Sequence, residues 1–195
     1  MYVIGLTGGM GMGKSTAANV FRRARIPVFD ADRVVHALGA KGGRAVGPIA
    51  KAFPGVIQGG AVDRTRLRRQ ALAEKNGLAR IEAILHPLVR AEERHFLARA
   101  RRAGQRIAVL DIPLLFETRG EGRADRVIVV SAPASVQRAR LQRRGKMQPD
   151  ELSAILARQM PDREKRRRAD LVVPTGLSRH HAGRVLRRLI RELRA

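Results

Sequence analysis

The 195-residue chain contains no cysteine and no tryptophan, and its aromatic residues are one tyrosine and five phenylalanines. The lack of cysteine excludes disulfides, thiolate metal ligands and cysteine nucleophiles, and it is compatible with a reducing compartment. No stretch approaches the roughly 18 consecutive apolar residues of a membrane-spanning helix. The N-terminus also lacks the basic segment and apolar core of a signal peptide. We therefore expect a soluble, cytoplasmic protein.

Acidic residues are scarce beside basic ones. There are 17 Asp and Glu residues against 40 Lys and Arg, of which 34 are Arg, so the formal charge is +23. Such a field attracts nucleotides, acidic cofactors and nucleic acids alike. The basic residues are spread over several helical segments, and few aromatic side chains are present to stack on bases. We favour a solvated arginine-rich surface with incidental polyanion affinity over dedicated nucleic-acid recognition.

One glycine-rich motif, GGMGMGKST at residues 8–16, matches the Walker A pattern Gly-x-x-x-x-Gly-Lys-Ser. It follows the apolar run 3–6 and precedes a helical pattern that begins at Lys14. Glycines let backbone N–H groups turn towards a polyphosphate, and the helix adds the positive end of its dipole. A glycine-rich turn that binds nothing is the less favoured alternative. The predicted ATP-binding residues are Gly11, Met12, Gly13, Lys14, Ser15 and Thr16.

Three side chains have predicted roles around the bound phosphates. Lys14 reaches the β- and γ-phosphate oxygens, and the Ser15 hydroxyl is a ligand of the Mg²⁺ that bridges them. We expect the Lys14 side chain to be exposed. Asp111 ends the apolar run 107–110 and resembles a Walker B carboxylate, which makes it the second predicted magnesium ligand. A helix or loop cap is an equally weighted alternative for Asp111.

Short apolar runs alternate with helical patterns along the chain, which is typical of a parallel sheet flanked by helices. Residues 31–103 read as almost wholly helical with no strand, and Pro87 should break or bend a helix there. Ser178 is expected to cap a final amphipathic helix. The expected strands cover residues 3–7, 26–29, 107–110, 127–130 and 171–173. We therefore predict an α/β fold with a helical insertion between its second and third strands.

Successive blocks of the chain resemble the dephospho-coenzyme A kinase family. The blocks are IGLTGGMGMGKST at 4–16, VFDAD at 28–32, ILHPL at 84–88, LDIPLLFE at 110–117, DRVIVV at 125–130 and RQMPDREKRRRAD at 158–170. Many NTPases share the first block, whereas the later blocks in this order are far more specific. The resemblance implies a three-layer P-loop NTPase fold with a five-stranded parallel sheet of order 2-3-1-4-5.

The resemblance also implies which parts of the chain bind each substrate and which reaction the protein catalyses. The nucleotide-binding core would comprise residues 1–31 and 104–195, the helical acceptor-binding subdomain residues 32–103, and the lid residues 140–160. In the reaction, ATP with Mg²⁺ phosphorylates the 3′-hydroxyl of dephospho-coenzyme A to give coenzyme A and ADP. Two alternatives stay open: another small-molecule P-loop kinase acting on nucleosides or nucleotides, and a nucleotide-gated nucleic-acid-binding protein. The expected assembly is a monomer or a weak homo-oligomer.

On the acceptor side, Asp32 falls where the family places its proposed general base. An Asp within hydrogen-bond reach can orient a ribose hydroxyl and accept its proton. We therefore name Asp32 and Lys14 as catalytic. A helix N-cap is the structural alternative for the pair Asp30 and Asp32, and capping or packing is the alternative for the histidine of the ILHPL block. The predicted acceptor contacts are Thr7, Asp32, His86 and Arg90.

The arginines Arg140, Arg143 and Arg144 map to the lid of the family, where guanidinium groups close over the transferring phosphoryl group. A solvated arginine face is the competing interpretation. The chain departs from the family in one place: many members carry Asp or Asn after the last strand, where this chain has Pro174 and Thr175. A backbone-mediated adenine contact is compatible with this change.

Overall fold

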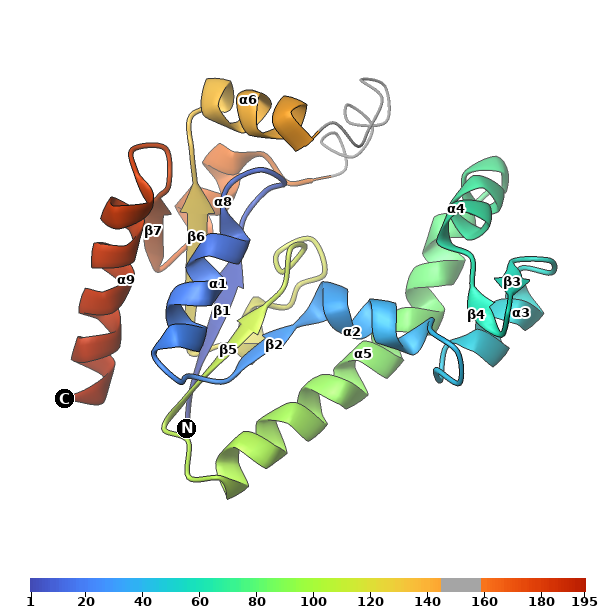
Figure 1. The fold of residues 1–195 in the computed structure, drawn as a ribbon, viewed down its shortest axis with the longest axis horizontal. Helices are drawn as coiled ribbons and strands as arrows, with labels where there is room; N and C mark the ends of the chain where they lie inside the picture. Colours follow the sequence, from blue (N-terminus) through green and yellow to red (C-terminus); the bar gives the residue numbers. More distant parts are fainter. Residues whose placement is uncertain (145–158) are drawn as a thin grey trace. The chain divides into compact units, whose positions relative to one another are not determined.

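The computed structural model describes residues 1–144 and 159–195 (Figure 1). The chain divides into two compact units. The first contains residues 1–30 and 99–195, and the second contains residues 31–98. Among the described residues, no helix is both long enough and apolar enough to span a membrane.

The first unit is built on a five-stranded sheet in which all neighbouring strands are parallel, with the spatial order β2-β5-β1-β6-β7. Counted along the chain within this sheet alone, the order is 2-3-1-4-5, which confirms the predicted topology. The central strands are almost wholly buried because helices or loops cover both faces. The strands are β1 (Tyr2–Thr7), β2 (Val28–Asp30), β5 (Ile107–Asp111), β6 (Arg126–Ser131) and β7 (Leu171–Pro174).

Two helices, α1 (Lys14–Arg23) and α9 (Arg179–Arg194), pack together on one face of this sheet (Figure 1). Phe21 of α1 and Leu186 of α9 are both completely buried in the core cluster that also contains Ile4 and Leu6 of β1. The Ser178 hydroxyl accepts a hydrogen bond from the backbone N–H of His181 at 3.0 Å, so the predicted cap of α9 is confirmed.

The opposite face is covered by residues 112–124 and by α8 (Asp162–Arg168), which packs on β6. The approach is close at Gly5, where an added Cβ would lie 2.9 Å from Leu115 Cδ2 and 3.2 Å from Ala124 Cβ. The sheet therefore lies between two covering layers, as predicted. The remaining elements of this unit are η1 (Glu121–Arg123) and α6 (Ala134–Arg144).

The second unit is mainly helical and has its own core, which includes Leu38, Ile49 and Phe53. Asp63 caps one of its helices, since Oδ1 accepts from the N–H groups of Thr65 at 2.9 Å and Arg66 at 3.0 Å. The elements are α2 (Ala31–Leu38), α3 (Val46–Ala52), β3 (Ile57–Gln58), β4 (Ala61–Val62), α4 (Arg64–Ala73) and α5 (Gly77–Arg102), whose last residues belong to the first unit.

One expectation for this unit, the absence of strands, is wrong. The unit does contain strands, because β3 and β4 form an antiparallel hairpin that turns at Gly59 and Gly60. Strands of two residues are too short to show an alternating pattern. Pro87 was expected to break or bend a helix, and α5 continues through this residue, so the helix is not broken there. Proline removes one backbone hydrogen bond, but Leu85 and Leu88 on either side pack against the core of the unit and hold the helix together.

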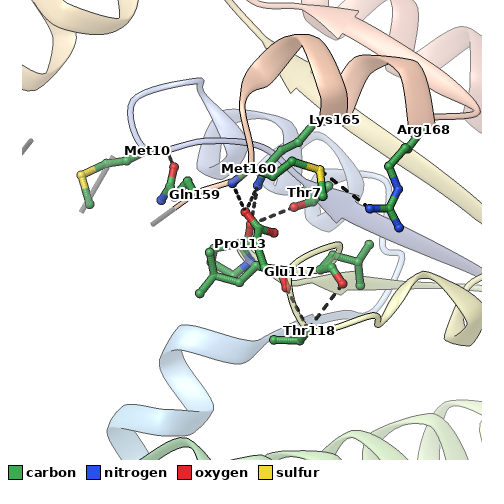
Figure 2. Close-up of polar contacts among 11 residues, drawn as sticks. Thr7, Met10, Pro113, Glu117, Thr118, Gln159, Met160, Lys165 and Arg168 are labelled. Atoms are coloured by element: carbon green, nitrogen blue, oxygen red, sulfur yellow. Dashed lines mark hydrogen bonds and ion pairs between the residues drawn. The ribbon is translucent and has the colours of Figure 1, made fainter. Parts of the chain in front are cut away.

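A buried ion pair joins α8 to the loop after β5 in the first unit (Figure 2). Lys165 Nζ lies 2.8 Å from Glu117 Oε1, and the two side chains are 1% and 16% exposed. Lys165 Nζ also donates to the Pro113 carbonyl at 3.3 Å. Because removing one member leaves the other buried without its partner, such pairs are costly to break.

We predict that Lys165→Met lowers the free energy of unfolding by about 3–5 kcal/mol, measured by chemical denaturation. The matched control is Arg188→Met, which removes the exposed Arg188–Glu192 pair and should cost at most about 1 kcal/mol. Combining Lys165→Met with Glu117→Gln should recover part of the loss, because the buried charge is then gone. Equal losses for the two single variants would contradict a structural role for the buried pair.

Candidate active site

The phosphate loop, residues 8–13, connects β1 to α1 and needs glycine at two positions for different reasons. At Gly8 an added Cβ would lie 2.7 Å from the Val130 carbonyl oxygen, so no side chain fits between the loop and β6. Gly13, the N-cap of α1, has φ 90°, a conformation that favours glycine. Gly13 has no side-chain oxygen to cap the first turn of α1, although its carbonyl accepts from the N–H of Thr16 at 3.1 Å. The loop therefore ends at a helix N-terminus suited to an anion.

Lys14 pairs with Asp111 at the carboxyl end of β5. Lys14 Nζ lies 2.5 Å from Asp111 Oδ1, and the two side chains are 16% and 3% exposed. The expectation of an exposed Lys14 is therefore wrong, because the buried carboxylate draws the ammonium group inward. Burial raises the pKa of Asp111 above its ordinary value of 3.8, although the charge and hydrogen bond of Lys14 oppose this.

Ser15 and Asp111, the predicted magnesium ligands, supply a hydroxyl and a carboxylate. Ser15 is exposed in the first turn of α1. Such oxygen donors suit Mg²⁺, which in nucleotide sites takes one or two protein ligands and completes its shell with phosphate oxygens and waters. Among the described residues, no group of three or more His, Asp or Glu side chains forms a metal cage. The residues present fit a Mg²⁺ ion shared with a nucleotide.

Arg140, a predicted lid residue, lies against the phosphate loop. Its Nη2 donates to the Thr175 carbonyl at 2.6 Å, and its Nη1 donates to the Gly11 carbonyl at 3.3 Å. This half-buried side chain is not part of a solvated face. Arg143 is exposed, and the side chain of Arg144 and most of the predicted lid, residues 145–158, lie outside the described residues.

A cavity of about 500 Å³ opens beside the phosphate loop, a size typical of small-molecule sites. It lies at the carboxyl ends of β6 and β7, where parallel sheets bind ligands. Met12 and the β7 side of this cavity were predicted from the sequence as parts of the ATP site. The β6 side, including Ser131, was missed although the same strand-end rule that identified Asp111 applies there. The lining residues are Met12, Ser131, Ala132, Pro133, Ala134, Gln137, Asp162, Arg166, Val172, Pro174, Gly176 and Leu177.

Thr7, a predicted acceptor contact, is completely buried. Its Oγ1 donates to the Pro113 carbonyl at 2.9 Å (Figure 2). The proton of this hydroxyl is thus engaged inside the first unit, where it supports the loop that follows Asp111.

The other predicted acceptor residues belong to the second unit. Asp32 is exposed in the first turn of α2, which begins at Ala31, so it lies inside the helix and not at its N-cap. His86 and Arg90 are both exposed on α5. Residues four apart on a helix share a face. His86 therefore lies inside the helix and is not packed in the core, and it shares a face of α5 with Arg90.

A family model described as dephospho-CoA kinase matches residues 2–178. The relatives named dephospho-CoA kinase include a Paramagnetospirillum magneticum protein, 60% identical over 166 residues, or 85% of this chain and 78% of the relative. Another, from Mesorhizobium japonicum, is 52% identical over 194 residues, or 100% of this chain and 98% of the relative. The crystal structure of a Thermus thermophilus protein is 34% identical, with a TM-score of 0.84 over 98% of this chain and 97% of its own.

The raised pKa of Asp111 predicts a dependence of stability on pH. Because the folded state holds this proton more tightly than the unfolded state, ionising Asp111 lowers the free energy of unfolding as the pH rises above 3.8. Asp111→Asn cannot ionise. Relative to the unsubstituted protein, its melting temperature should therefore increase as the pH rises from 3.8 and level off above the folded pKa. The measurement is a melting curve for both proteins at each pH without Mg²⁺. A melting temperature of the variant that falls relative to that of the unsubstituted protein as the pH rises would contradict the prediction.

Proposed function

We propose that this chain, which belongs to the dephospho-CoA kinase family, transfers the γ-phosphoryl group of ATP to the 3′-hydroxyl of dephospho-CoA, giving CoA and ADP. The observation that carries the proposal is the family match over residues 2–178. That range contains both the phosphate loop with its Lys14–Asp111 pair and the acceptor candidates of the second unit.

On the donor side, the triphosphate would lie along the phosphate loop and the N-terminus of α1. Lys14 Nζ, which forms an ion pair with Asp111 in this structure, would bind β- and γ-phosphate oxygens. Its charge would stabilise the negative charge that develops on them during transfer. The adenosine would occupy the cavity of about 500 Å³. Polar backbone groups on the β6 and β7 sides of that cavity would replace the Asp or Asn that many family members carry after the last strand.

Ser15 Oγ and the Asp111 carboxylate would hold Mg²⁺, which when bound neutralises charge on the β- and γ-phosphates. Asp111 would then have two cationic neighbours, the metal and Lys14. Its burial makes such neighbours favourable, because ionisation of a buried carboxylate is otherwise costly.

On the acceptor side, Asp32 would accept the proton of the 3′-hydroxyl as phosphoryl transfer proceeds. His86 and Arg90 would bind the acceptor, with the Arg90 guanidinium suited to its phosphate groups. All three side chains are exposed and therefore accessible to a substrate.

The surplus of positive charge supports a secondary proposal of incidental polyanion affinity. A hollow of about 540 Å³ in the first unit is lined by Arg163, Arg166, Arg167 and Val172. Three guanidinium groups around one hollow suit phosphate groups without selecting a base. We also propose a cytoplasmic location and a monomer or weak homo-oligomer, consistent with a biosynthetic enzyme acting on free nucleotides.

The function is tested by incubating purified protein with ATP, Mg²⁺ and separate acceptors: dephospho-CoA, nucleosides, nucleoside monophosphates and RNA. Formation of CoA with no product from the other acceptors is the expected result. Phosphorylation of a nucleoside or nucleotide alone would instead indicate another small-molecule kinase. ATP turnover that depends on RNA would favour a nucleic-acid-binding protein.

Asp32→Asn should lower kcat by about 10²–10⁴, because asparagine keeps the shape but cannot accept the proton. Affinity for ATP should stay within a few-fold, since the phosphate loop is unchanged. The measurement is steady-state kinetics with dephospho-CoA, together with ATP binding and a melting curve.

Asp63→Asn is the matched control in the same unit. It makes the same chemical change at a helix cap, where asparagine also caps well, so activity should be retained. If Asp32→Asn keeps activity within about threefold, general-base catalysis of the size expected is not supplied by this carboxylate.

A further inference from the structure

Both polar backbone groups of Met10, at the tip of the phosphate loop, bind glutamine side chains. The Met10 N–H donates to Gln159 Oε1 at 3.1 Å (Figure 2). The Met10 carbonyl accepts from Gln137 Nε2 at 2.7 Å. Gln137 lies on α6, and Gln159 lies a few residues before α8. Neither glutamine was among the residues predicted from the sequence.

The two glutamines also pack against the loop. An added Cβ at Gly9 would lie 3.3 Å from Gln159 Oε1 and 3.5 Å from Gln137 Nε2. Both side chains are half-buried, so their hydrogen bonds are partly shielded from water. A loop tip flanked by Gly9 and Gly11 has little intrinsic conformational restraint, and these two contacts add to the backbone hydrogen bond from the Met12 N–H to the Gly9 carbonyl at 3.1 Å.

The Met10 contact is one of three in which a side chain from outside the phosphate loop binds the carbonyl of a loop residue. Gln137 binds the Met10 carbonyl, Arg140 the Gly11 carbonyl, and Thr175 Oγ1 the Met12 carbonyl at 2.6 Å. In a planar trans peptide the C=O and the following N–H point in opposite directions. Fixing the carbonyls of Met10 and Met12 on protein side chains therefore turns the N–H groups of Gly11 and Gly13 to the other side.

We infer that Gln137 and Gln159 are positioning residues that hold the tip of the phosphate loop in the shape that receives the triphosphate. They act through Met10 and not through the reacting atoms. The inference rests on the proposed function only in that the loop binds phosphate groups. Preorganising the loop before binding improves affinity because less order is lost when the ligand arrives.

The two contacts have opposite hydrogen-bond polarity, because Gln159 accepts and Gln137 donates. They can therefore be tested with two variants that carry the same charge. An N–H needs an acceptor and a C=O needs a donor, so only Gln137 must donate and only Gln159 must accept. Gln159→Glu keeps the acceptor for the Met10 N–H. Gln137→Glu places an acceptor against the Met10 carbonyl. Both variants add one negative charge beside the same peptide, so electrostatic repulsion of the phosphates is similar in the two.

The measured quantities are the affinities for ATP, inorganic triphosphate and adenosine, with KM and kcat where turnover is seen. Relative to Gln159→Glu, Gln137→Glu should bind ATP and triphosphate at least about fivefold more weakly, the effect of one lost hydrogen bond. Because Gln137 also lines the cavity proposed for adenosine, adenosine affinity is measured to report that wall separately, and the loss of triphosphate affinity should exceed any loss of adenosine affinity. The kinetic effect should be on KM for ATP and not on kcat.

Equal losses in the two variants would mean that charge alone acts, and would overturn the inference. A loss confined to adenosine would also overturn it, because Gln137 would then act only as a wall of the nucleoside cavity that it lines and not on the phosphate loop. If Gln137→Glu lowers the melting temperature, the neutral pair Gln137→Met and Gln137→Asn replaces it: the shorter amide should restore part of the triphosphate affinity, and no difference between them would refute a donor role. Binding of triphosphate needs no acceptor substrate, so this test is independent of whether dephospho-CoA is the acceptor.

Discussion

Parallel pairing of β1 with β5 on one side and β6 on the other determines where the functional groups of the first unit lie. Leu6 pairs with Asp111, and Thr7 pairs with Val129. The phosphate loop that follows Thr7 therefore begins at the same edge of the sheet at which β5 and β6 end. This constraint brings together a lysine, a carboxylate and a nucleoside-sized cavity that are far apart in the sequence.

The first unit uses its few lysines where a compact charge is needed. Only six residues of the chain are lysine against 34 arginines, yet both cations paired with the carboxylates Asp111 and Glu117 are lysines, at positions 14 and 165. The planar guanidinium group of arginine carries five N–H donors and needs more room, whereas the ammonium group of lysine is a compact charge at the end of a flexible alkyl chain. The arginines contribute instead at the surface and against backbone carbonyls, as Arg140 does.

Local signals in the sequence identified the phosphate loop, Asp111 and the cap at Ser178, because each depends on residue type and spacing along the chain. The hairpin of β3 and β4 escaped detection because its strands have two residues each. The continuity of α5 through Pro87 depends on packing, which no local rule for proline includes. The roles of Gln137 and Gln159 depend on contacts between distant segments, and a glutamine carries no signal of such a contact in its own sequence neighbourhood.

The two sides of the proposed reaction differ in how far they are organised before a substrate arrives. On the donor side, Lys14, Thr175 and Arg140 are each bonded to other protein groups. Such a site resists distortion, and its affinity for phosphate depends on contacts already formed. On the acceptor side, Asp32 and His86 are exposed on helices of the second unit. Their orientation towards a hydroxyl therefore depends on the substrate itself, so substitutions there should affect the chemical step more than the binding of ATP.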